Sequence, residues 1–66
     1  MLHIQLYRAR REHARLGLLI DMEQAAPRPD AVRIAELKKR KLAARDRIAH
    51  LESRERAEGA VRPQTV

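Results

Sequence analysis

The sequence contains no cysteine, only one aromatic residue and no long apolar run. Without cysteine the chain forms no disulfide, no thiolate zinc site and no cysteine nucleophile. A single ring, that of Tyr7, leaves no row of aromatic platforms on which nucleobases stack. The longest strongly apolar run, residues 18–20, is far too short to cross a bilayer, and the first twenty residues lack the apolar core of a secretory signal. We therefore expect a cytoplasmic protein without a membrane span.

Length and charge limit the chain further. A chain of 66 residues forms one domain at most and buries too small a share of its surface to be comfortably stable alone. We therefore expect it to self-associate into a helical bundle or to bind a larger protein. The net charge of +6 favours acidic proteins, nucleic acid or anionic lipid as partners.

Apolar or neutral residues recur every three or four positions in two stretches, which predicts helices over residues 2–24 and 31–57. In each helix these positions form one narrow line, which we call the seam. The expected seam residues of the two helices are Leu6, Ala9, His13, Leu16, Ile20, Leu37, Lys41, Ala44, Ile48 and Leu51. Glu23 and Glu55 stand where the next apolar residue of each line is due, so the seams end before them.

Residues 25–30 form the predicted turn, because Pro27 and Pro29 interrupt helical geometry and Asp30 is suited to cap the following helix. A connection this short makes the helices antiparallel neighbours. Folding the chain there opposes residues whose numbers sum to about 57, so that the two seams meet and small residues face large ones. We predict an all-α fold, a coiled-coil-like antiparallel hairpin over residues 1–58, followed by a flexible tail over 59–66.

No set of residues has the spacing of a catalytic or metal site. His3, His13 and His50 lack ligand spacing, and we interpret His13 as a polar seam residue facing Ala44. The aliphatic part of Lys41 is expected to cover Leu16 while its ammonium reaches water. A two-helix hairpin offers no enclosed pocket in which catalytic groups converge. We therefore expect no enzymatic activity, no cofactor and no metal.

A basic cluster on the second helix suggests phosphate contacts. Its members are Lys38, Lys39, Arg40, Arg45 and Arg47. On a helical wheel they flank both sides of the seam instead of forming one outward stripe, and Glu12 is placed to meet Arg47. Direct nucleic-acid binding is therefore the alternative hypothesis, and binding to a membrane surface ranks third because the basic residues do not oppose one broad apolar face.

Several apolar residues lie outside the seam. They are Leu18, Leu19, Met22, Ala35, Leu42 and Ala49. An isolated hairpin would leave these side chains in water, which is typical of a surface that binds another helix. The sequence therefore favours a non-enzymatic protein-interaction or regulatory module that self-associates or binds a larger protein through its helix faces.

Two blocks also resemble a known family. The segment from His13 to Ile20, and the segments Leu37-Lys-Lys-Arg-Lys-Leu42 and Arg45-Asp46-Arg-Ile48 after a proline-rich turn, are similar to the YdcH-like family of short bacterial proteins of unknown function. The resemblance covers roughly residues 6 to 52. It implies a small cytoplasmic α-hairpin of bacterial origin, and no activity comes with it.

The matching polar positions of that resemblance are His13, Lys38, Lys39, Lys41 and Asp46. The chain departs from the pattern at Gly17, where aspartate is usual, at Ala44, where a larger apolar residue is usual, and at Arg45, where lysine is common. The smaller Ala44 leaves space on the seam that His13 is placed to fill.

Overall fold

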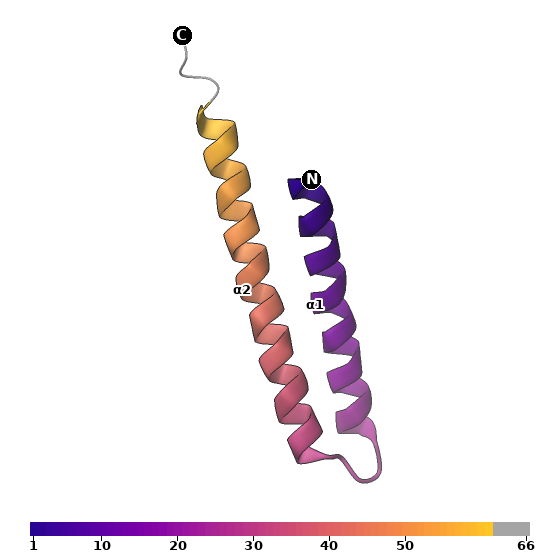
Figure 1. The fold of residues 1–66 in the computed structure, drawn as a ribbon. Helices are drawn as coiled ribbons and strands as arrows, with labels where there is room; N and C mark the ends of the chain where they lie inside the picture. Colours follow the sequence, from indigo (N-terminus) through magenta and orange to yellow (C-terminus); the bar gives the residue numbers. More distant parts are fainter. Residues whose placement is uncertain (62–66) are drawn as a thin grey trace.

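The computed structural model describes residues 1–61, with side chains placed through residue 58. Within these residues, α1 (Leu2–Ala25) and α2 (Ala31–Val61) are the helices, and they run antiparallel and side by side, with no strand between or beside them (Figure 1). The molecule is a rod with extents of 61 × 15 × 14 Å. The prediction of an all-α helical hairpin is confirmed.

The turn forms where the two prolines and the aspartate predicted it. The Asp30 carboxylate accepts hydrogen bonds from the backbone N–H groups of Val32, at 3.0 Å, and Arg33, at 3.1 Å. These bonds satisfy two donors that the first turn of α2 leaves without helical partners. Asp30 is therefore the N-cap of α2.

Glu23 joins the turn to both helices. Its carboxylate accepts a hydrogen bond from the Asp30 backbone N–H at 3.4 Å and lies 3.4 Å from the Arg33 guanidinium of α2. Glu23 interrupts the apolar pattern of α1 because at this level of the hairpin polar contacts replace apolar packing. The seam therefore ends at Ile20 with an ion pair beyond it.

The core consists of the seam, and it falls into two clusters. The first contains Leu6, Ala9 and Leu51, with Leu2 and Ile48 packed against it. The second contains Leu16, Ile20 and Leu37, with Leu19 and Ala44 packed against it. The remaining seam residues, His13 and Lys41, are half-buried. A single line of contacts between two helices therefore holds the fold together.

The helix α2 ends at Val61 instead of at Ala57, so residues 59–61 are helical where a tail was expected. Gly59 lowers helix stability by only about 1 kcal/mol relative to alanine, and α2 contains no proline. An ion pair of 3.9 Å between Arg54 and Glu58 lies near this end of the helix. The predicted flexible tail over residues 62–66 lies outside the described residues. Because α2 is longer than α1, its C-terminal end extends past the N-terminus of α1 (Figure 1).

Replacing Leu16 tests the seam as the source of stability. Leu16 is 2% exposed, so we expect Leu16→Ala to lower the free energy of unfolding by about 2 to 5 kcal/mol. Val32→Ala is the control, because Val32 is 80% exposed and its loss should change stability by less than about 0.5 kcal/mol. Urea unfolding followed by circular dichroism at one protein concentration measures both, and equal midpoints for the two variants would contradict the assignment.

Gly17 lies beside the Lys41 side chain, and a Cβ placed on Gly17 would lie 3.8 Å from Lys41 Nζ and 3.9 Å from its Cε. Both distances are ordinary van der Waals contacts, so the site accepts a methyl group. We expect Gly17→Ala to raise the free energy of unfolding by about 1 kcal/mol, from helix propensity. Ala14→Gly, at an exposed position of α1, should lower it by a similar amount. A lower urea midpoint for Gly17→Ala would show that Lys41 needs the space.

Candidate functional site

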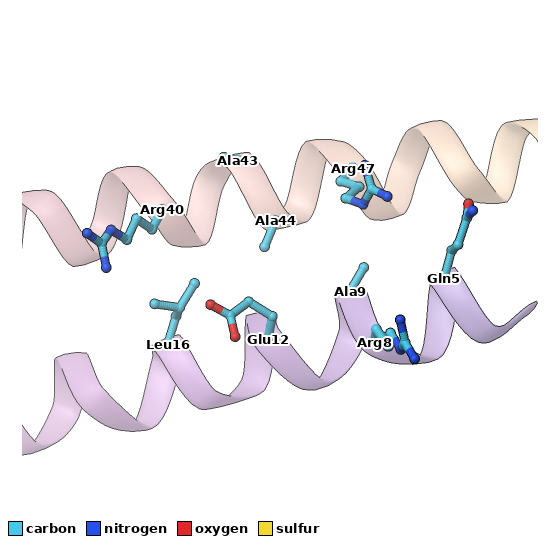
Figure 2. Close-up of a pocket in the computed structure, with 9 residues that line it drawn as sticks. All are labelled: Gln5, Arg8, Ala9, Glu12, Leu16, Arg40, Ala43, Ala44 and Arg47. Carbon is cyan, nitrogen blue, oxygen red and sulfur yellow. The ribbon is translucent and has the colours of Figure 1, made fainter. Parts of the chain in front are cut away.

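The seam divides the hairpin surface into two long edges, and an open groove lies along each. We call the first the arginine groove. Figure 2 shows its lining residues, which are Gln5, Arg8, Ala9, Glu12, Leu16, Arg40, Ala43, Ala44 and Arg47. Ala9 and Leu16 point from α1, and Ala44 points from α2, into the space between the helices (Figure 2). The groove therefore has an apolar floor with charged walls.

We call the groove on the other edge the Leu42 groove. It is lined by His13, Ile20, Asp21, Gln24, Lys38, Lys41, Leu42 and Arg45. Its walls carry three basic groups, those of Lys38, Lys41 and Arg45, and the carboxylate of Asp21, and the arginine groove carries three arginines and the carboxylate of Glu12. The two grooves therefore have the same balance of charge, and they differ in that the basic groups of the first are all guanidinium groups.

The arginine groove brings together residues from both helices, and of its basic residues the sequence indicated only the two on α2. Arg40 and Arg47 were candidates for phosphate contacts, but Arg8, Ala43 and Gln5 were not singled out. A signal for Arg8 was present in the sequence, since it lies one turn of helix before Glu12, which was expected to face Arg47. The other basic candidates lie elsewhere: Lys38 and Arg45 line the Leu42 groove, and Lys39 is exposed.

The expected contact between Glu12 and Arg47 does not form. Glu12 instead lies 3.4 Å from Arg15 one turn further along α1. Among residues 1–58, neither Arg8 nor Arg47 forms an ion pair, and Arg40 has only a 3.8 Å contact with Glu36 on its own helix. Over the same residues, the ion pairs that join the helices are Arg10 with Glu52, at 2.8 Å, and Glu23 with Arg33. Within the described side chains, no residue of the opposite helix therefore neutralises the arginines of the groove.

A third patch continues the basic surface onto the outer side of α1. Tyr7, Arg8, Arg11, Glu12 and Arg15 line it. The Arg11 guanidinium lies over the Tyr7 ring, 5.8 Å from its centre, and donates a hydrogen bond of 3.3 Å to the Tyr7 hydroxyl. Because Arg8 belongs to this patch and to the arginine groove, the two form one continuous basic surface.

The six apolar residues outside the seam do not form one surface. Leu42 is 55% exposed and lies in the Leu42 groove, and Ala35 and Ala49 are two turns before and after it on the same side of α2. Leu19 follows Glu12 by two turns, which places it on the edge of the arginine groove, and it packs against the core. Leu18 and Met22 follow Arg11 and Arg15 by two turns, which places them on the outer side of α1, where they are 65% and 68% exposed. The predicted partner residues therefore lie on different sides of the hairpin.

The described side chains include no group of three or more histidine, cysteine or acidic residues arranged to hold a metal ion. Neither α1 nor the described length of α2 is long and apolar enough to cross a membrane. The arrangement of open grooves with charged walls is suited to contact with another macromolecule.

Comparison with known proteins agrees with the resemblance found in the sequence. The family described as "Protein of unknown function (DUF465)" matches residues 6–52. Those residues include the turn, both core clusters except Leu2, and both grooves except Gln5. No curated protein and no solved structure shows significant similarity to the chain. The match spans more than half of the sequence, and the chain belongs to the DUF465 family of small YdcH-like proteins of unknown function.

Proposed function

We propose that the hairpin is a non-enzymatic interaction module that associates with a second copy or with a larger protein through its helix faces. The observation that carries this proposal is the exposure of large apolar side chains outside the seam on both helices, with Leu42 55%, Leu18 65% and Met22 68% exposed. Burying such side chains against another helix gains roughly 25 cal/mol for each Å² removed from water.

The size of the core supports the same proposal. Six residues among those described are buried, and they lie along one line between two helices. A hairpin with so small a core gains stability when a further helix covers its edges, as in helical bundles. Association then supplies packing that the isolated hairpin lacks.

Removing the outer apolar side chains tests this proposal. We expect the purified protein to sediment above the monomer mass at micromolar concentration, or to capture a larger protein from the native cell. Either association should weaken at least about tenfold, or 1.4 kcal/mol, in Leu42→Gln or in Leu18→Gln/Met22→Gln. Lys39→Gln, at an exposed position, is the control. A protein that sediments as a monomer over a hundredfold dilution, and whose variants capture the same proteins as the wild type, would contradict the proposal.

Nucleic-acid binding is the second candidate, and the continuous basic surface is the observation that favours it. Arg8, Arg11 and Arg15 of α1 share one side of the hairpin with Arg40 and Arg47 of α2. Phosphate contacts release counterions, so the logarithm of the affinity for duplex DNA should fall with the logarithm of salt by roughly 0.9 per phosphate bound. Helix association through apolar contacts should largely survive the same rise in salt. Fluorescence anisotropy with a labelled duplex, repeated at several salt concentrations, distinguishes the two candidates.

A further inference from the structure

We propose that the arginine groove binds one amphipathic α-helix of a partner protein, a helix with acidic residues seven positions apart beside its apolar stripe. The proposal rests on the proposed function and names the chemistry of the partner. It follows from the floor of the groove and from the spacing of its arginines. It follows also from the absence, within either helix of this chain, of two acidic residues seven positions apart.

The floor of the groove favours a helix as the occupant. Ala9 and Leu16 of α1 and Ala43 and Ala44 of α2 are small or apolar, and they leave room along the line where the two helices meet (Figure 2). A third helix packs into such a line by placing its own side chains between those of the pair. From Gln5 to Leu16 the α1 side of the groove measures about 16 Å, at 1.5 Å per residue, which corresponds to three turns of a partner helix.

The arginines in the walls of the groove favour a partner helix with acidic side chains. Arg40 and Arg47 lie seven residues apart on α2, so they stand on one side of that helix about 10 Å apart along its axis. Carboxylates at positions i and i+7 of a partner helix have the same separation and can meet both guanidinium groups. Arg8 on the opposite wall adds a third basic group.

The same walls argue against nucleic acid in this groove. The Glu12 carboxylate points into the space between the helices, where it would repel a phosphate backbone (Figure 2). A partner helix avoids that repulsion, because it can place an alanine or a lysine opposite Glu12.

A second copy of this chain is a poor occupant for a reason of spacing. The acidic residues of α1 are Glu12, Asp21 and Glu23, and those of α2 are Glu36, Asp46, Glu52, Glu55 and Glu58. No two acids within one of these helices stand seven positions apart. Two copies joined at this edge would also bring Arg40 and Arg47 close to their own counterparts, and like charges at an interface oppose association. The spacing therefore points to a helix from a different, acidic protein.

A designed peptide tests the proposal. The probe is a fluorescein-labelled helix of about four turns, with a leucine and alanine stripe and glutamates at i and i+7 on one flank; a control peptide of equal composition carries the glutamates opposite the stripe. Anisotropy with the full-length protein should show saturable binding of the probe, at least about tenfold tighter than that of the control. No binding of the probe at millimolar protein, or equal binding of both peptides, would overturn the proposal.

The chain offers a matched pair of variants. Arg40→Gln/Arg47→Gln removes two charges seven residues apart from the arginine groove, and Lys38→Gln/Arg45→Gln removes two at the same spacing from the Leu42 groove. We expect the first pair to weaken probe binding at least about tenfold and the second less than about threefold. Equal losses would show a general charge effect and overturn the proposal. Tighter binding of a labelled RNA or DNA strand, lost in the first pair alone, would overturn it in favour of nucleic acid.

Failure of this proposal is distinguishable from failure of the proposed function. If Arg40→Gln/Arg47→Gln leaves association in the native cell unchanged while Leu42→Gln abolishes it, the interaction module stands and its partner binds the other edge. If none of Arg40→Gln/Arg47→Gln, Leu42→Gln and Leu18→Gln/Met22→Gln changes any association, both proposals fail. Circular dichroism of each variant should retain the helical signal of the wild type, because Arg40, Arg47 and Leu42 are all exposed.

Discussion

The fold depends on one narrow line of apolar contacts between two helices. Leucines at positions 6, 16, 37 and 51 are almost completely buried, and each is 2% or 3% exposed. The polar contacts at the turn, from Asp30 and Glu23, orient the helices but lie in solvent-accessible positions where such bonds contribute little stability. Because this line is so narrow a core, most residues off it are exposed, and Leu2 and Leu19 are among the few that pack against it.

The seam also determines which residues share each edge of the hairpin surface. A seam flanked by charged residues on both sides separates one edge, where three arginines and Glu12 line a groove, from another edge, where two lysines, one arginine and Asp21 surround Leu42. The ion pair between Arg10 and Glu52 lies at the end of the hairpin near the α1 N-terminus, and that between Glu23 and Arg33 lies at the turn. Among residues 1–58, no residue of the opposite helix neutralises the charge of the arginines in the arginine groove. The proposed partner helix meets this uncompensated charge along the line where the two helices join.

The sequence predicted what depends on periodicity and on local turn chemistry. The two helices, the turn and the capping role of Asp30 follow from residues close together in the chain, and the structure has all three. Contacts across the hairpin were harder to predict. A flexible exposed side chain such as that of Glu12 can form ion pairs of similar energy with several neighbouring residues. In the structure Glu12 pairs with Arg15 instead of Arg47. The sequence placed the outer apolar residues on their helices but not on a side of the hairpin, and Arg8 was missed because the basic cluster was sought on one helix alone.

The register of the two helices decides which residues share an edge, and a crosslink measures it directly. The chain has no cysteine, so the double variant Ala9→Cys/Ile48→Cys contains a single possible pair. In the structure both positions belong to the same core cluster, and mild oxidation of dilute protein should form an intramolecular disulfide. The control Ala9→Cys/Lys41→Cys is displaced by seven residues, about 10 Å along α2, and should stay reduced. Faster intramolecular bridging of the control than of the first pair would contradict the hairpin register and, with it, the arginine groove.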